Sequence, residues 1–287
     1  SCAVNPQAME EVRFAIQKCE TAKNVVVIGG GPAGMEAARV AALEGHHVTL
    51  YEKNDHLGGV MGDICTASFK QNIKKLTEWY KTQLQKLQVE VHLNTTITGE
   101  EEFLKTCDKI IIGCGAKPII PNIDGINGDN VITMLDAHRD YSLLKGDNIV
   151  VCGGSASGLD GALEMASELG KNVTVVEMLP QCGKDVFFIN QITLFNKLAE
   201  ANVQLLTNTK VIAMDAQGLS VECADQTIKK IPADTIVNAF GMAPDLTLVD
   251  KIKEKYHIKT RVVGDSNALG KIGEAIRDGF YAATSLE

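Results

Sequence analysis

The chain has no two cysteines in C-x-x-C spacing, although eight cysteines are scattered through its 287 residues. A dithiol redox centre or a four-thiolate zinc site needs such pairs, so the sequence indicates neither kind of site. We therefore expect most of the cysteines to be reduced, buried and packed as small apolar side chains.

Long apolar runs and basic runs are also lacking. A membrane-spanning helix needs roughly 18 to 20 apolar residues in succession, and no segment of this chain comes close. The first residues lack the charged and apolar regions of a secretory signal peptide. The net charge of -8 would repel nucleic acid and anionic membranes. These absences predict a cytoplasmic protein without a nucleic-acid or membrane partner.

The composition that remains, 45% hydrophobic and 22% charged, suffices for one large domain or two intertwined ones with substantial cores. The clearest local pattern is a strand, a glycine-rich turn, a helix, a second strand and an acid. These follow in order at 24–28, 29–34, 35–44, 47–51 and Glu52.

Three glycines of this turn each have a separate task in a nucleotide-binding βαβ unit. Gly29 lets the chain turn sharply, Gly31 removes the side chain that would block a pyrophosphate, and Gly34 lets helix and strand pack closely. The helix N-terminus favours an anion, and Glu52 is placed to accept hydrogen bonds from a ribose diol. Residues 24–53 therefore predict an ADP-binding unit.

The same pattern occurs a second time, at 148–152, 153–158, 159–169, 172–176 and Glu177. An internal duplication predicts two nucleotide sites, and hydride transfer between two nucleotide cofactors is the economical reason to hold both. The second turn has Ser155 where the first has Gly31. A hydroxyl there can bond a phosphate or obstruct it, and the residues alone leave both readings open.

Other positions lie where a ligand or a domain crossing is expected. Gly59, in the loop after the first acid, lets the backbone approach a bound ligand. Gly115 and Gly241 each follow a buried strand and precede a proline, as expected where a chain crosses between domains. Asp265 precedes a helix expected at 275–283, where it can cap that helix or hold a flavin's ribityl chain.

The first 23 residues predict a leader into the first strand, with helical spacing at 9–19. Cys2 has no neighbouring cysteine, so the residues alone make it a bystander. Along the helix expected at 72–87, we expect Trp79 and Tyr80 both to be core residues.

Four segments together resemble the C-terminal half of the old-yellow-enzyme-like iron-sulfur flavoenzymes. This group includes 2-enoate reductase, 2,4-dienoyl-CoA reductase, bile-acid-inducible NADH:flavin oxidoreductases and trimethylamine dehydrogenase. The resemblance covers essentially the whole chain and rests on Ala3–Pro6, Gly31–Ala38, Gly45–Lys53 and Leu57–Gly59.

The resemblance implies an α/β fold of two Rossmann-like dinucleotide-binding domains, with the NAD domain inserted into the FAD domain. The leader, the first part of the FAD domain, the NAD domain and the second part of the FAD domain are then expected at 1–23, 24–118, 119–240 and 241–287. It implies FAD contacts at Gly29, Gly31, Gly34, Glu52, Lys53, Gly59, Gly115 and Asp265. It implies nicotinamide-nucleotide contacts at Gly153, Ser155, Gly158, Glu177 and Gly241.

The implied activity is hydride transfer from NADH to FAD by stacked cofactor rings, with no catalytic side chain. In the intact parent, electrons would continue through a [4Fe-4S] cluster to FMN in an upstream barrel of the same chain and reduce an enoate or dienoyl-CoA. Cys2 matches the last ligand of that cluster, so it would bind metal only in such a parent.

Two other functions stay open at this point. A stand-alone NADH:acceptor oxidoreductase would use the same sites and release its electrons to quinone, dye or oxygen. A non-catalytic module would bind ADP where FAD is expected, as trimethylamine dehydrogenase-type relatives suggest, and Ser155 keeps that reading alive.

Overall fold

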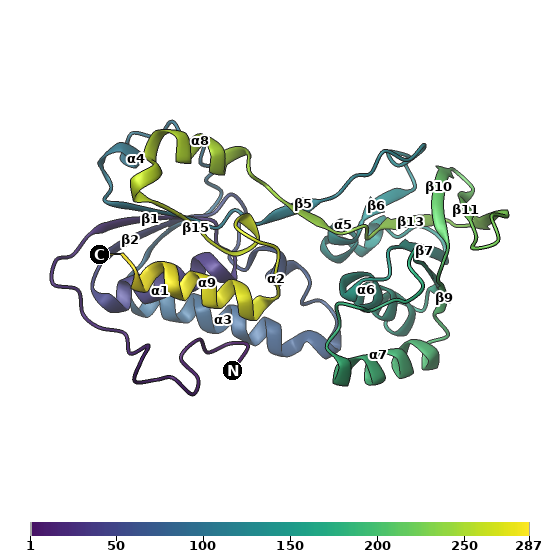
Figure 1. Cartoon of the computed structure of the whole chain (residues 1–287), viewed down its shortest axis with the longest axis horizontal. Coiled ribbons are helices and arrows are strands. Elements are labelled where there is room, and N and C mark those ends of the chain that lie inside the picture. Colours follow the sequence, from purple (N-terminus) through teal and green to yellow (C-terminus); the bar gives the residue numbers. More distant parts are fainter. Residues whose placement is uncertain (1, 287) are drawn as a thin grey trace. The chain divides into compact units, whose positions relative to one another are not determined.

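The computed structural model describes residues 2–286, which form two compact units (Figure 1). The first unit runs to Lys117 and resumes at Ala243, and the second spans Pro118–Met242. Each unit is built on a parallel sheet with helices packed on it. The expected α/β fold class is therefore confirmed.

The first unit contains a five-stranded sheet in the order β15-β4-β1-β2-β3. All neighbouring strands in it are parallel. In the central strand, Val27 lies between Leu50 and Ile111. The strands are β1 Asn24–Ile28, β2 His47–Tyr51, β3 Glu90–His92, β4 Lys109–Ile112 and β15 Thr260–Val262.

Helices cover both faces of this sheet, which explains why its central strands are continuously apolar. Val25 and Val27 pack with α1, α3 and α9, while Val26 and Ile28 pack with α4 and α8 (Figure 1). The helices of the unit are α1 Pro32–Glu44, α2 Gly59–Asp63, α3 Gln71–Lys86, α4 Phe103–Thr106, α8 Thr247–Tyr256 and α9 Ile272–Thr284. Short 3-10 turns are η1 Ser68–Lys70, η3 His257–Lys259 and η4 Gly264–Ser266.

Small residues let α1 and α9 pack very closely. A Cβ at Gly279 would lie only 2.1 Å from the carbonyl oxygen of Ala33. That contact brings α9 against the first turn of α1, which is the end of the helix that carries the glycine motif.

The second unit repeats the parallel sheet in the order β6-β13-β7-β8-β9. Its strands are β6 Val131–Thr133, β7 Asn148–Cys152, β8 Asn172–Val176, β9 Gln204–Leu206 and β13 Thr235–Asn238. Helices α5 Met134–Arg139, α6 Ala156–Ser167 and α7 Phe188–Glu200 pack with one face, and η2 Tyr141–Leu143 follows α5. An antiparallel sheet packs on the other face, from β10 Lys210–Asp215, β11 Gly218–Glu222 and β12 Ile228–Pro232.

The two connections between the units are short strands. They are β5 Ala116–Pro118 and β14 Met242–Pro244, and they pair with each other. Gly115 and Gly241 each stand immediately before one of them.

Three expectations from local pattern are wrong. Residues 9–19, whose apolar spacing is helical, form turns and irregular chain, and Phe14 stacks edge-on with Phe280 and Tyr281 of α9. Trp79 is 43% exposed, with the Arg39 guanidinium over its ring, whereas Tyr80 is fully buried as expected. Of the cysteines, all free, only Cys107, Cys152 and Cys182 are buried.

Several boundaries also differ. The helices after the two glycine turns begin at Pro32 and Ala156, three residues before the expected starts, and α9 begins at Ile272 instead of Ala275. Within residues 2–286, no helix is both long and apolar enough to cross a membrane.

Candidate nucleotide-binding sites

Two of the three motif glycines in the first unit are required by the fold itself. Gly29 has φ +105°, and a Cβ there would lie 2.2 Å from the carbonyl oxygen of Gly113 at the end of β4. A Cβ at Gly34 would lie 1.9 Å from the carbonyl oxygen of Gly29. Any side chain at either position would push α1 away from the strands on which it starts.

Gly31 is different, because the fold gives no reason for a glycine there. Its φ of -74° suits any residue, and no protein atom lies within 4 Å of where its Cβ would be. The missing side chain leaves open space directly in front of the N-terminus of α1. That space, with unpaired helix N–H groups facing it, suits a phosphate.

Glu52 is held beside this turn with only 5% of its surface exposed. Its Oε2 accepts a hydrogen bond from the Gly30 N–H at 2.6 Å, and its Oε1 accepts one from the Asn54 N–H at 2.8 Å. Each carboxylate oxygen has a further lone pair. The carboxylate is therefore oriented in advance and can still accept bonds from a diol.

The loop after Glu52 returns to the glycine turn. The Gly58 N–H donates to the Gly30 carbonyl at 2.9 Å. Gly59 has φ +54°, and a Cβ there would lie 3.1 Å from the Cα of Gly31. The structure thus brings Gly59 to the turn, while Lys53 is exposed next to Glu52.

Gly115 and η4 are joined by a side chain that the sequence patterns did not single out. The buried Ser266 hydroxyl accepts from the Gly115 N–H at 2.6 Å and lies 3.2 Å from the Gly115 carbonyl, to which it donates. Only its place after Gly264 and Asp265 could have drawn attention to it.

Asp265 does not cap α9, so that alternative is wrong. The cap position is Lys271, whose N–H donates to the Glu274 side chain, while Asp265 Oδ1 accepts from the Gly270 N–H at 3.0 Å. Burial raises the pKa of the Asp265 carboxyl. Its contact with a flavin stays a prediction.

The second unit reproduces the same cradle. A Cβ at Gly153, where φ is +121°, would lie 2.2 Å from the Ala239 carbonyl oxygen, and one at Gly158 would lie 2.0 Å from that of Gly153. The Gly154 N–H donates to Glu177 Oε2 at 2.7 Å, as Gly30 does to Glu52. The Leu179 N–H donates to Glu177 Oε1 at 2.8 Å.

The duplication extends beyond the motif into the following loop. The Gly183 N–H donates to the Gly154 carbonyl at 2.7 Å, six residues after the acid, as at Gly58 in the first unit. Cys182 and Leu57 both fill the space over the second glycine of their turn. Cys182 was missed from the sequence, although the equal spacing from acid to glycine was a signal for it.

Ser155 keeps the backbone conformation of Gly31. Its φ and ψ are -71° and 173°, against -74° and -179° at Gly31, and its hydroxyl makes no capping bond to α6. The serine therefore leaves the shape of the turn unchanged. Instead, the first N–H of α6 is bonded to a carboxylate from the loop after β8, that of Asp185.

Gly241 lies in the connection and not in the second glycine turn. It has φ +110°, and its carbonyl accepts from the Ile119 N–H at 3.0 Å. Its contact with a nicotinamide nucleotide stays a prediction.

Cys2 is half-buried, and hydrogen bonds from the backbone of Val4 and Asn5 lower the pKa of its thiol. Among residues 2–286, no three His, Cys, Asp or Glu side chains gather as a metal site. The iron-sulfur ligation expected of Cys2 stays a prediction.

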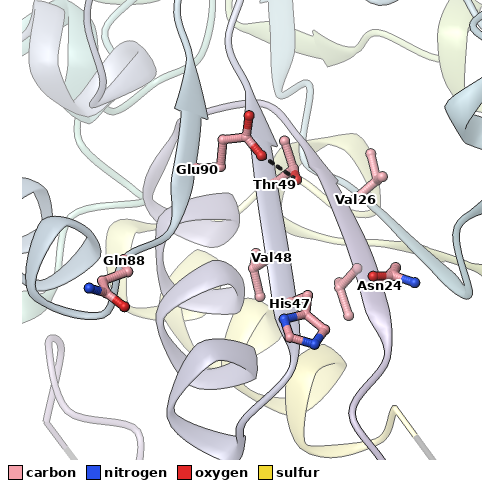
Figure 2. A pocket seen from close by; sticks show the side chains of 8 residues that line it. Asn24, Val26, His47, Val48, Thr49, Gln88 and Glu90 are labelled. Carbon is pink, nitrogen blue, oxygen red and sulfur yellow. Dashed lines mark hydrogen bonds between the residues drawn. The ribbon is translucent and has the colours of Figure 1, made fainter.

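A surface pocket of about 320 Å³ lies elsewhere in the first unit (Figure 2). It is lined by the amino-terminal ends of β1, β2 and β3, where Thr49 donates to Glu90 at 3.5 Å. Nucleotides bind at the carboxyl ends of such strands. This pocket is therefore separate from the glycine cradle.

A family model described as pyridine nucleotide-disulphide oxidoreductase matches residues 23–268. The chain belongs to the pyridine nucleotide-disulphide oxidoreductase family. This assignment brings FAD and a nicotinamide nucleotide as the family's cofactors and confirms an oxidoreductase. The family's name refers to a disulphide, but all eight cysteines of this chain are free.

This chain is shorter than two curated proteins that it resembles. It is 34% identical over 289 residues to bilirubin reductase of Mediterraneibacter gnavus, covering 100% of this chain and 44% of that protein. It is also 34% identical to NADH oxidase of Thermoanaerobacter brockii, covering 99% and 44%. The chain thus spans less than half the length of these relatives.

A solved structure agrees with this relationship. A 2-naphthoyl-CoA reductase complex superposes with a TM-score of 0.93 at 32% identity, covering 99% of this chain and 43% of that one. The resemblance to part of the enoate-reductase-like flavoenzymes is therefore confirmed.

Proposed function

We propose that the first unit binds FAD, that the second binds NADH, and that the chain passes a hydride from NADH to FAD as the electron-input portion of a larger reductase. The observation that carries this proposal is the pair of matching cradles. Each has two sterically required glycines and an acid fixed by two backbone N–H groups.

For the first cofactor, Gly31 and Gly59 provide backbone without side chains in front of α1, and Glu52 provides the ribose acceptor. The helix N-terminus compensates the charge of the phosphates. FAD, when bound, would supply the group that accepts the hydride, which carries one proton and two electrons.

For the second cofactor, Glu177 supports a preference for NADH over NADPH. Its carboxylate can accept from a ribose 2′-hydroxyl but would repel a 2′-phosphate. The following residues, Met178-Leu179-Pro180, include no arginine to receive such a phosphate.

No side chain is needed as a nucleophile or a general base, since hydride transfer requires positioning of the two partners. The two thiols near the cradles are also poor nucleophiles. Burial raises the pKa of Cys114 to about 12 and that of Cys182 to about 11, so both stay protonated at neutral pH.

We also propose that the parent protein carries FMN and a [4Fe-4S] cluster, with Cys2 as one ligand. The support is the shared relationship to reductases more than twice as long as this chain. Four thiolates are needed for such a cluster, so the other three would come from the same parent.

Anaerobic mixing of the FAD-loaded protein with NADH tests the proposal. The visible flavin band should bleach, and a redox dye added afterwards should be reduced. A protein that retains ADP and no flavin would instead be the non-catalytic module, because ADP is colourless. A protein that bleaches and then passes electrons to oxygen as fast as to any other acceptor would favour the second candidate, a stand-alone oxidase. One relative carries the name NADH oxidase, although this chain spans only 44% of that protein.

A further inference from the structure

A carboxylate of the protein itself, that of Asp185, binds the first N–H of α6. Both carboxylate oxygens of Asp185 lie 3.0 Å from the backbone nitrogen of Ala156. Ala156 is the first residue of a 12-residue helix, so its N–H has no partner inside that helix. Asp185 is exposed and belongs to the irregular loop between β8 and α7.

The first unit has no counterpart to this bond. At the position of Ala156 it has Pro32, which lacks an N–H. In the first unit, Val60 lies two residues after Gly58, the loop glycine whose N–H donates to the turn. In the second unit, Asp185 lies two residues after Gly183, which makes the same bond. The carboxylate is therefore an addition to the second cradle and not part of the shared design.

The bonded N–H lies where the pyrophosphate of a dinucleotide would sit. In βαβ units the pyrophosphate sits at the N-terminus of the helix and takes its unpaired N–H groups. A carboxylate and a pyrophosphate cannot both occupy that N–H, and they repel each other at close range.

We propose that Asp185 is an internal competitor for the pyrophosphate of the nicotinamide nucleotide, and that it must leave Ala156 before the nucleotide binds. This inference rests on the proposed NADH site in the second unit. In this role Asp185 sets coenzyme affinity. It weakens the binding of NADH and of NAD alike, and so favours the exchange of one for the other.

The test variant is Asp185→Asn, because an amide oxygen can still accept from Ala156 while the charge is gone. Asp225→Asn is the matched control. It removes one charge from an exposed turn of the same unit, where Asp225 accepts from the Thr227 N–H at 3.1 Å. Asp185→Ala is a second test variant, which removes both the charge and the acceptor.

The probe is ADP-ribose, which has the pyrophosphate and both riboses but cannot reduce flavin. It is titrated calorimetrically into protein whose first unit is saturated with FAD. Asp185→Asn should bind it roughly five- to tenfold more tightly than the parent, as expected for removing one repulsive charge a few ångströms away in a solvated site. Asp225→Asn should match the parent.

Equal or weaker binding by Asp185→Asn and Asp185→Ala, in protein that keeps its FAD and its melting temperature, overturns the inference while the proposed function stands. If parent and variants all fail to bind ADP-ribose, the NADH site itself is wrong and the inference falls with it. Binding that is detectable only in the Asp185 variants would support the inference most strongly.

Discussion

Replacement of Glu52 by Gln tests the first cradle at a buried carboxylate. The carboxylate accepts from the N–H groups of Gly30 and Asn54 at 2.6 and 2.8 Å. A glutamine has only one side-chain oxygen. Its amide group must therefore face one of two backbone donors, which leaves that donor without an acceptor.

The expected cost follows from these two bonds. An unsatisfied buried donor costs about 1–3 kcal/mol, and the bond that survives changes from charge-assisted to neutral and loses about 1 kcal/mol more. The same change weakens any bond to a ribose diol. The lost backbone bonds lower stability with or without FAD, whereas a diol bond weakened by about 1.4 kcal/mol or more raises the dissociation constant for FAD by about tenfold or more.

The assay is the flavin-to-protein ratio after dialysis, followed by titration of the apoprotein with FAD. Glu177→Gln is the matched control, since Glu177 makes the same two bonds in the other unit, at 2.7 and 2.8 Å. It should weaken nicotinamide-nucleotide binding and leave the flavin in place. If Glu52→Gln holds FAD as tightly as the parent, or if Glu177→Gln loses it, the assignment of the two cradles is refuted.

Three further predictions concern the same units. Gly31→Ala should keep the melting temperature of the parent, because its Cβ meets no protein atom, but it should retain little flavin, because the Cβ fills the space expected for the phosphate. Gly34→Ala should lose about 3 kcal/mol or more of stability in chemical denaturation, because its Cβ would lie 1.9 Å from a backbone oxygen. Equal melting temperatures for the two variants would contradict the steric argument. Reduction of the flavin, followed by stopped flow, should be faster with NADH than with NADPH. Glu177→Ala should reduce the ratio of the two rates. Faster reduction of the parent by NADPH would exclude a role for the Glu177 carboxylate in coenzyme choice. The His56 ring donates a hydrogen bond to Asp55 at 2.6 Å and makes a second contact with Asp63, and both raise the pKa of His56 above its usual 6.5. The stabilising effect of this charge should be complete below about pH 6.5 and disappear as the pH rises through the raised pKa. Melting curves of the parent and His56→Asn across that range should converge at high pH, and a constant difference would mean that charge on the imidazole is not involved.

The two βαβ units could be predicted from the sequence because their requirements are local. Gly29 and Gly34 are five residues apart, and the clash that demands the second involves the backbone of the first. Glu52 follows its strand directly, so strand register alone carries it to the turn. Patterns of this kind survive in the one-dimensional order of residues.

Local pattern was least reliable where packing partners come from far along the chain. The apolar spacing at 9–19 is that of a helix, but the segment forms turns and irregular chain, and Phe14 packs against Phe280. Trp79 and Tyr80 are adjacent and equally apolar by type. Only their positions on α3 relative to α1 decide that Tyr80 is buried and Trp79 lies exposed under Arg39.

By itself, the sequence determined the α/β class, the duplication and most residues of both cradles, since these depend on spacing within about 30 residues. The tertiary structure alone decided that Ser266 bonds Gly115 from 151 residues away and that Asp185 lies on the first N–H of α6. Such contacts follow from which strands become neighbours in a sheet and where the loops at their carboxyl ends converge. No short-range periodicity encodes that order, so the acid on the second cradle could be found only in the folded chain.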